Sequence, residues 1–573
     1  MSRRSGFVIA SVVVLSAALA SAALAQRPAV TVVTGTVVGA DGAPMKLAHA
    51  HLQRPITAGR IARAQVTPDG RFAIATTETG GFRLLFTGVD HYSTSVPLLI
   101  TSPTTIALDV RLKHHTYIDS LDRVRAIGDF NNFKADSGRP LVRQPDGRYT
   151  LEVETSADTL AYQLVGLDTV ANGTRTTGGT LADRYSYVDN AGYRSVIRAR
   201  NRRATIVFDP SALQRPAAAP SVTFRDTTTQ MARCYSLIRD LQERSQALFD
   251  SSGAARVRRD STLRYDWAPF VARRMAALQR ERDPIVRQLL LFQFFGIASM
   301  SGRLDSALGW RIAREIPPTS PWWAFPEVGP PSAMMLAFRA GLGRTETPRA
   351  GTPPDTVLNR LMLGYLDRIV AEHPDSVVRG EALASAIGWA EGSRRNEYYL
   401  RFARDYPNSP SASYLNAAFA PGRIWQVGRR VPTFRLASLD DTAATYTPES
   451  LAGKPYLLEF WATWCGPCIV EMADLHQAHD SLAADSVEFI SVSLDARSED
   501  VRTFRNGEWR MPWRHAIAPG GFSNPQMRQL EIMFVPRAIL VGRDGTILAV
   551  DGDLRGRSLL PTIRRALRAS PSP

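Results

Sequence analysis

The feature that most constrains the fold of this chain is a pair of cysteines, Cys465 and Cys468, that separates an apolar run from a helical pattern. Residues 456–461 read Tyr-Leu-Leu-Glu-Phe-Trp, and such a run suits a central strand that is covered on both faces. From Pro467 to about residue 484 the pattern is helical, and a proline suits the first turn because its missing N–H costs nothing there. The order of strand, cysteine pair and helix therefore places Cys465 at a helix N-terminus.

This placement predicts redox chemistry. The sulfur of Cys465 would lie near unpaired backbone N–H groups, which stabilise a thiolate. Because only the thiolate attacks a disulfide, we expect Cys465 to be the nucleophile and Cys468, one turn further on, to resolve the mixed disulfide. The competing interpretation is half of a structural zinc site, which needs four ligands, and the sequence has no second cysteine pair to complete one. We therefore expect a redox-active dithiol with no metal and no cofactor.

The sequence around the cysteines is similar to thioredoxin. Phe-Trp-Ala-Thr-Trp precedes Cys465, and Gly-Pro separates the cysteines, as in that family. The other elements that the pattern predicts are a short strand at 431–436, a strand at 489–494, a helix near 499–505, a strand pair at 538–541 and 546–550, and a last helix from about 558. With its N-terminal extension, the segment resembles the exported TlpA and ResA group. The resemblance implies an α/β thioredoxin-like domain over residues 427–571.

The resemblance also implies roles for residues beside the dithiol. Glu459 stands where thioredoxin keeps a buried aspartate, so it would have a raised pKa and accept the proton of Cys468; the alternative is a carboxylate that points outward at a strand edge. Pro536 matches the cis-proline that faces the cysteines and leaves the backbone of Val535 to pair with an extended substrate; the alternative is a trans turn. Arg537 replaces the usual threonine, and we expect it to affect substrate choice more than chemistry.

Four further residues complete the expected site. Glu471 matches a glutamate that ResA-like proteins place near the active site, and the alternative is a solvated helix carboxylate. Trp464, Gly466 and Pro467, which surround the first cysteine, join Val535 as the expected substrate-binding residues. The third cysteine, Cys234, is expected to be a buried and inert thiol on a helix, and the alternative is an auxiliary redox partner.

Short β-type runs separated by turns fill the first part of the chain. In residues 29–114, Gly-Thr-Val-Val at 35–38 followed by Asp-Gly-Ala-Pro at 41–44 resembles the carboxypeptidase regulatory-like domain, which implies a β-sandwich that acts as a spacer or interaction module. In residues 118–212, Gly-Asp-Phe-Asn resembles the immunoglobulin-like fold of glycogen-binding modules. Sugar binding in that family relies on exposed tryptophans, and this segment has none; Phe133 stands where one would be expected. We therefore expect a structural sandwich, and the alternative is a carbohydrate-binding one.

Residues 222–422 have apolar residues three or four apart, which predicts an all-helical region. His-Pro-Asp-Ser at 373–376 and Tyr-Pro-Asn-Ser at 406–409 lie roughly 33 residues apart, close to the tetratricopeptide (TPR) period. The region therefore resembles helical repeats that precede thioredoxin domains in exported proteins. We expect the pair Trp322 and Trp323 to pack between helices, and the alternative is a partner-binding surface.

The first residues predict export. A basic start, an apolar stretch at 6–24 and Ala-Leu-Ala at 23–25 are typical of a cleaved signal peptide over residues 1–25, which indicates a periplasmic location. The alternative is an uncleaved anchor, because the stretch nearly reaches the ~20 residues that span a bilayer. The net charge of +15 comes from arginines scattered through every segment, without the basic stripe that nucleic-acid binding requires, so we expect no nucleic-acid partner.

These patterns predict a multidomain chain with two N-terminal β-sandwiches, an all-α, TPR-like middle domain and a C-terminal α/β thioredoxin fold. We expect an exported reductase of client protein disulfides, because Gly-Pro between the cysteines resembles the reducing thioredoxins. In an oxidising compartment it would need electrons from a membrane protein of the DsbD or CcdA type. Two alternatives stay open: a periplasmic disulfide oxidase or isomerase, and a partner-binding scaffold in which the redox domain is accessory.

Overall fold

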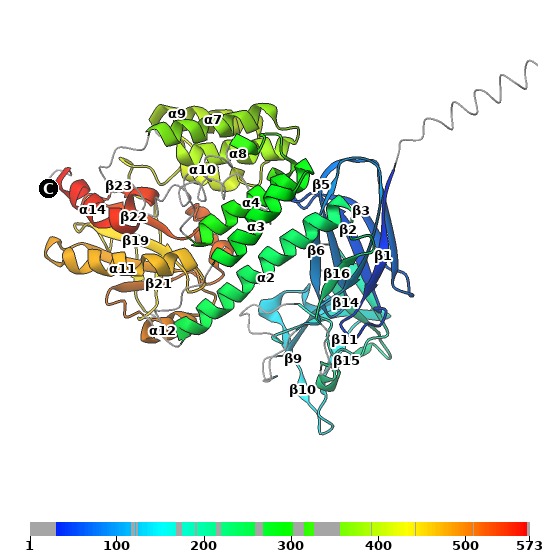
Figure 1. Cartoon of the computed structure of the whole chain (residues 1–573). Helices are drawn as coiled ribbons and strands as arrows, with labels where there is room; N and C mark the ends of the chain where they lie inside the picture. The colour runs from blue at the N-terminus through cyan, green and yellow to red at the C-terminus, as the bar shows by residue number, and fades with distance from the viewer. Residues whose placement is uncertain are drawn as a thin grey trace, which may run out of the picture.

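The structure is a computed structural model with three regions along the chain: a β-rich first part, a helical middle part and a C-terminal α/β part (Figure 1). The residues that it describes are 30–115, 121, 124–167, 175–189, 192–213, 219–257, 267–301, 314–325, 356–390, 392–441, 443–507 and 509–569. The predicted signal peptide at 1–25 lies outside these residues. No helix within the described ranges is both long and apolar enough to cross a bilayer.

The first unit is a β-sandwich, as the sequence predicts. Its two sheets have the strand orders β16-β7-β1-β4 and β3-β2-β5-β6. Buried and partly exposed residues alternate along β1 and β4, because one face of each strand packs on the core and the other faces outward. The strands are β1 (Thr31–Val38), β2 (Ala48–Gln53), β3 (Arg60–Gln65), β4 (Arg71–Thr76), β5 (Gly80–Gly88), β6 (His91–Ile100), β7 (Thr105–Arg111) and β16 (Ser221–Phe224).

A second β-sandwich lies between β7 and β16 along the chain, so the first sheet is completed only after the second unit. Its two sheets have the orders β13-β14-β12-β8-β9 and β10-β11-β15. The strands are β8 (Arg125–Gly128), β9 (Arg139–Pro140), β10 (Val142–Arg143), β11 (Tyr149–Glu154), β12 (Thr159–Val165), β13 (Arg184–Val188), β14 (Gly192–Arg198) and β15 (Arg203–Phe208). Phe133, where a sugar-binding tryptophan would be expected, is 9% exposed and so offers no stacking surface.

The helical region begins later than predicted. Residues 221–224 pair antiparallel with β7 and belong to the first sandwich, so the helices start at Gln230 and not at residue 222. The described helices are α2 (Gln230–Val257), α3 (Ala268–Arg280), α4 (Pro284–Ser301), α7 (Thr356–Glu372), α8 (Ser376–Trp389), α9 (Gly392–Asp405) and α10 (Ala412–Phe419). Asp375 of the His-Pro-Asp-Ser motif caps α8 by accepting a hydrogen bond from the backbone of Val377 at 2.8 Å. The assignment to TPR-like repeats stays a prediction.

The helices and the first sandwich share one hydrophobic core. The backbone N–H of Leu99 on β6 donates to the sulfur of Met231 on α2 at 3.2 Å. Trp322 and Trp323 lie in this core in a short 3-10 helix, η4 (Pro321–Ala324), and both are fully buried, as expected for packing rather than for a binding surface. The second sandwich has its own smaller core.

The C-terminal region has the thioredoxin-like arrangement. Its sheet has the order β18-β17-β21-β20-β19-β22-β23. The strand β19 lies inside this sheet, pairs parallel with β20 and antiparallel with β22, and is buried at every residue. The elements are β17 (Leu436–Ser438), β18 (Thr445–Tyr446), β19 (Tyr456–Trp461), α11 (Gly466–Ser481), β20 (Glu488–Ser493), α12 (Ser498–Gly507), β21 (Arg514–Ile517), α13 (Pro525–Gln529), β22 (Arg537–Val541), β23 (Ile547–Val550) and α14 (Leu559–Ala569).

Two local predictions for this region are wrong. A strand was predicted at 431–436, but β17 begins only at Leu436. The residues before it form hydrogen bonds with the turn after β22 instead of a sheet neighbour: the backbone N–H of Val431 donates to the carbonyl of Gly545 at 2.9 Å. The predicted start of the domain at 427 is also too late. Trp425 is fully buried in the core of the C-terminal domain and donates from its ring nitrogen to the carbonyl of Leu530 at 2.5 Å.

Candidate active site

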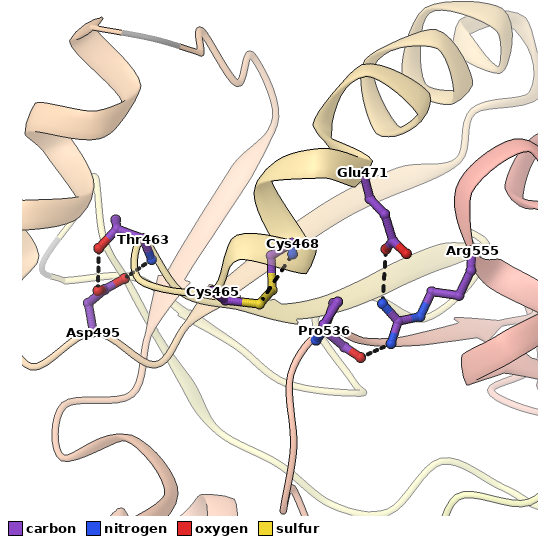
Figure 2. Close-up of a disulfide and its surroundings, with 7 residues drawn as sticks. All are labelled: Thr463, Cys465, Cys468, Glu471, Asp495, Pro536 and Arg555. Carbon is purple, nitrogen blue, oxygen red and sulfur yellow. Dashed lines mark hydrogen bonds and ion pairs between the residues drawn. A yellow bond between two sulfur atoms is a disulfide. The ribbon is translucent and has the colours of Figure 1, made fainter. Parts of the chain in front are cut away.

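The two cysteines lie where β19 ends and α11 begins, and they form a disulfide with an S–S distance of 2.02 Å (Figure 2). Cys465 is the N-cap of α11, and the backbone N–H of Cys468 donates to its sulfur at 3.2 Å. The helix terminus therefore directs an N–H group at this sulfur, where negative charge develops when the disulfide is opened. Cys465 is 5% exposed and Cys468 is 2% exposed, so the first cysteine is the more accessible of the two.

The loop that leads to Cys465 is fixed from the neighbouring strand. Asp495, which follows β20 and is buried, accepts hydrogen bonds from the backbone N–H of Thr463 at 3.0 Å and from its hydroxyl at 2.7 Å. The hydroxyl of Ser493 donates to the same carboxylate at 2.8 Å. Sequence reasoning missed Asp495, because nothing in its local pattern ties it to a loop 32 positions earlier.

Glu459 lies in the middle of β19, opposite Ser491 of β20 and Ala538 of β22. Its side chain is buried rather than directed outward at a strand edge, and its Oε2 atom has no hydrogen-bond partner. Burial raises the pKa of this carboxyl to about 8, with a smaller lowering effect from the Ser491 hydroxyl. The carboxyl therefore stays protonated to a higher pH than an exposed glutamate does.

A small cavity joins Glu459 to the second cysteine. It has a volume of about 20 Å³, which is room for about one water molecule. Carboxyl, sulfur and guanidinium groups face it together with apolar side chains. The lining residues are Leu457, Glu459, Cys468, Glu471, Leu475, Pro536, Arg537, Ala538, Leu554, Arg555, Gly556 and Leu559.

Arg555 links two predicted site residues on one side of the disulfide. One of its terminal nitrogens donates to Glu471 at 2.9 Å and the other donates to the carbonyl of Pro536 (Figure 2). The Val535–Pro536 peptide bond is cis, as the sequence predicts. Glu471 is thus held by an ion pair instead of being a free solvated carboxylate. Sequence reasoning missed Arg555, which lies 84 positions beyond Glu471.

The predicted substrate-binding residues surround the disulfide with different exposures. Trp464 is 58% exposed, and its ring lies 6.2 Å from that of Phe522 in an edge-on arrangement. Gly466 and Pro467 are exposed at the first turn of α11, and Val535 is half-buried.

Two predicted residues lie away from the exposed part of the site. Arg537 is fully buried; it donates to the carbonyl of Glu531 at 2.9 Å, lies 3.4 Å from Asp551 and stacks on Phe534. A substrate therefore does not contact Arg537 directly, and the expected effect of this residue on substrate choice stays a prediction. Cys234 is buried in the core of the helices and the first sandwich, apart from the dithiol, and burial raises its pKa to about 12.

Comparison with known proteins identifies relatives of the C-terminal region. Residues 427–513 match the AhpC/TSA family. Thiol-disulfide oxidoreductase ResA of Oceanobacillus iheyensis is 31% identical over 17% of this chain and 63% of its own length. ResA of Bacillus anthracis is 26% identical over 23% of this chain and 72% of its own length, and thiol:disulfide interchange protein DsbE of Escherichia coli is 40% identical over 12% and 35%. The chain thus spans less than two thirds of the length of the first of these relatives.

Solved structures resemble the same region. The thioredoxin domain of a thiol-disulfide oxidoreductase from Bacteroides vulgatus is 24% identical and matches 24% of this chain and 96% of that one, with a TM-score of 0.22. A thiol-disulfide oxidoreductase from Bacteroides fragilis is 25% identical, matches 24% and 100%, and also has a TM-score of 0.22. These scores are too low to support the fold by themselves, and the assignment of a thioredoxin-like domain rests on the strand order and on the sequence relatives.

Proposed function

Because the C-terminal region is a thioredoxin-like domain whose relatives are named thiol-disulfide oxidoreductases, we propose that this protein is an enzyme that reduces disulfides of client proteins. The observation that carries the proposal is the position of Cys465. It caps α11, receives an N–H group from Cys468 at its sulfur, and forms a disulfide with that same residue. A sulfur at a helix N-terminus that can close a disulfide three residues away is suited to thiol–disulfide exchange.

The reaction has two exchange steps. In the reduced enzyme, the Cys465 thiolate attacks one sulfur of the client disulfide, and the other client sulfur leaves as a thiolate. Cys468 then gives up its proton and attacks the sulfur of Cys465, which breaks the mixed disulfide and releases the second client thiolate. Two electrons pass to the client, and the enzyme ends in the disulfide form described above.

Glu459 is the proposed proton acceptor for Cys468. Both residues line the same cavity, and a carboxyl with a pKa of about 8 is closely matched to a thiol, so the transfer between them costs little free energy. In the disulfide form at neutral pH, Glu459 would keep the proton that it has taken. The cavity extends to the Glu471–Arg555 pair, which offers that proton a polar route outward.

The client is proposed to bind across the exposed rim of the dithiol. Trp464, Gly466 and Pro467 supply an apolar surface beside Cys465, and the backbone of Val535 supplies groups that can pair with an extended chain. Pro536 sets the direction of that backbone, and Arg555 holds its carbonyl.

Export to the periplasm and supply of electrons from a membrane protein of the DsbD or CcdA type are part of the proposal. The signal-like pattern of residues 1–25 supports the first, and the need for reducing equivalents in an oxidising compartment supports the second.

The test combines the redox potential with client trapping in the full-length protein. We expect the Cys465–Cys468 couple to titrate near thioredoxin, at about −270 mV, and the reduced protein to reduce insulin. The Cys468→Ser variant should accumulate a mixed disulfide through Cys465, and Cys234→Ser is the matched control because its thiol is buried elsewhere. A potential near that of a strong oxidant, at about −120 mV, would instead assign the protein to disulfide formation. If no mixed disulfide formed through Cys465, the nucleophile assignment would be wrong.

A further inference from the structure

The helical region touches the loop that carries the cis-proline. Tyr414 on α10 packs edge-on against Phe534, with ring centroids 4.8 Å apart, and Phe534 is two residues before Pro536. Figure 1 shows the helical region lying against the C-terminal domain, and this ring contact joins the two at the redox site. The C-terminal domain therefore does not present its dithiol on an isolated surface.

Residues 420–425, which join α10 to the C-terminal domain, are held in place by hydrogen bonds. Arg423 donates to the carbonyls of Ala420 and Trp425, both at 3.2 Å. Trp425 in turn donates to the carbonyl of Leu530, just before the cis-proline loop. The position of Tyr414 relative to that loop is thus fixed by hydrogen bonds and a buried ring, not only by the aromatic contact.

Phe534 is also fixed from within the C-terminal domain. The buried guanidinium of Arg537 lies 5.0 Å from its ring centroid, and the carbonyl of Glu531 and the carboxylate of Asp551 hold that guanidinium. Phe534 is therefore a rigid platform on which the ring of Tyr414 rests.

Three large side chains around this platform and the disulfide remain exposed. Tyr414 is 45% exposed, Met533 is 43% exposed and Trp464, next to Cys465, is 58% exposed. We call Tyr414, its ring partner Phe534 and Met533, the chain neighbour of Phe534, the helical-side wall. A client whose sulfur reaches Cys465 and whose backbone runs along Val535 would continue over this wall.

We propose that the helical-side wall is a second contact surface for the client, which makes this enzyme selective for polypeptides that carry an apolar or aromatic side chain close to the reacting cysteine. The proposal rests on the proposed function. Phe534, which Tyr414 contacts, directly precedes Val535, and a strand advances about 3.3 Å per residue and presents alternate side chains to one face. We therefore expect the client side chain that meets Tyr414 to lie within about four residues of the client cysteine. A small disulfide that fills only the space at Cys465 does not reach the wall.

The experiment uses the full-length reduced protein and mixed disulfides between thionitrobenzoate and a cysteine compound. One set consists of a polar decapeptide with a central cysteine, in which a single Phe is moved through each neighbouring position. The small probe is N-acetylcysteine. Attack by Cys465 on the cysteine sulfur of the probe releases thionitrobenzoate, which is measured by absorbance, and Cys468 then displaces the thiol.

We expect the wild-type protein to react about 5-fold faster with at least one Phe-containing peptide than with the unsubstituted peptide. Tyr414→Ala should abolish this preference through a higher peptide concentration at the half-maximal single-turnover rate, with the limiting rate, the rate for the N-acetylcysteine probe and the redox potential unchanged. Tyr414→Phe should retain the preference, because the ring remains. Leu400→Ala is the matched control, since Leu400 is a 52% exposed side chain on α9 of the same region.

The inference is overturned if no Phe position is preferred, or if the preference survives in Tyr414→Ala. It is also overturned if Tyr414→Ala changes the small-probe rate and the potential as much as the peptide rate, because Tyr414 would then act only by holding the loop. Failure of the proposed function gives a different result, in which the wild-type protein releases thionitrobenzoate from neither the peptides nor N-acetylcysteine.

Discussion

Glu459 gives the most direct test of the chemistry at the scale of single residues. If it accepts the proton of Cys468, Glu459→Gln should slow the resolution of the mixed disulfide by about 100-fold and leave the first attack by Cys465 unchanged. Single-turnover quenching with a peptide mixed disulfide measures both steps, and Glu499→Gln on the exposed face of α12 is the control. Unchanged resolution in Glu459→Gln would show that the proton leaves by another route.

The same residue predicts a pH dependence of stability. Because the pKa of Glu459 is raised from 4.5 to about 8, the folded protein holds this proton more tightly than the unfolded chain does, and the free energy of unfolding should fall as pH rises through that window. Glu459→Gln cannot titrate, so its stability relative to wild type should rise by about 2 to 4 kcal/mol between the two ends of the window. Urea unfolding of the disulfide form at several pH values measures the difference in the free energy of unfolding between the two proteins. This difference would not change with pH if the pKa of Glu459 were the same in the folded and unfolded protein.

Among the site residues that were not predicted from the sequence, Arg555 is the one whose substitution we expect to lower activity most. Its two terminal nitrogens bond Glu471 and the carbonyl of Pro536 at once, which the single ammonium group of lysine cannot reproduce. Arg555→Lys should therefore lower kcat/KM for insulin by about 10-fold. Arg568→Ala, on the exposed end of α14, should have no effect, and equal loss in both variants would point to a general charge effect instead.

Residue-level prediction from the sequence succeeded where a motif is local. The cysteine pair, the buried carboxyl in the preceding strand and the proline before β22 each follow from short stretches of chain. Asp495 and Arg555 did not, because their partners lie 32 and 84 positions away and meet them only in the folded sheet. The burial of Arg537 was not predicted either, since it depends on contacts with Asp551 from another strand end.

At the scale of elements, the segment that joins α10 to the sheet is part of the C-terminal core. A fragment that begins at residue 427 lacks Trp425, and we expect it to be less stable than one that begins at residue 421 by about 3 to 5 kcal/mol, the usual result of removing a buried tryptophan. Urea denaturation of the two fragments tests this, and Trp425→Ala in the longer fragment should reproduce the loss. If the two fragments unfolded at the same urea concentration, Trp425 would not contribute to the cooperative unfolding of the C-terminal domain.

The sequence predicted most of the long elements and missed the short ones. The strands β19, β20, β22 and β23 and the helix α11 carry strong apolar or helical patterns. The strand β21 has only four residues and no clear alternation, and it forms because β17 and β20 supply partners on both sides. A pattern read along one strand does not contain that information.

At the scale of the whole molecule, the first sandwich and the helices share one core, and we expect them to unfold as one unit. An added Cβ at Gly81 on β5 would lie 3.0 Å from the ring of Phe325, next to the 3-10 helix that carries the buried tryptophans. Gly81→Val should therefore lower the stability of the sandwich and the helices together by about 1 to 3 kcal/mol. Circular dichroism during heating should show a single shifted transition, and Gly364→Ala, which meets no neighbouring atom, is the control. Loss of helix alone would contradict the shared core.

The order of the three regions could be predicted from the sequence pattern, because β-type runs, helical spacing and the redox motif follow one another along the chain. Their interleaving could not be read, since the four residues of β16 carry no mark that assigns them to a sheet built from residues more than a hundred positions earlier.

The return of β16 to β7 has a consequence for the order in which the chain is made. In a chain that emerges N-terminus first, β7 comes early but its edge stays without a partner until Ser221–Phe224 follow, roughly 100 residues later. The second sandwich, whose strands all lie within that interval, is complete first. The emerging chain can therefore close its inner unit before its outer one, and the edge of β7 is left open to pairing with a wrong strand for the longest time.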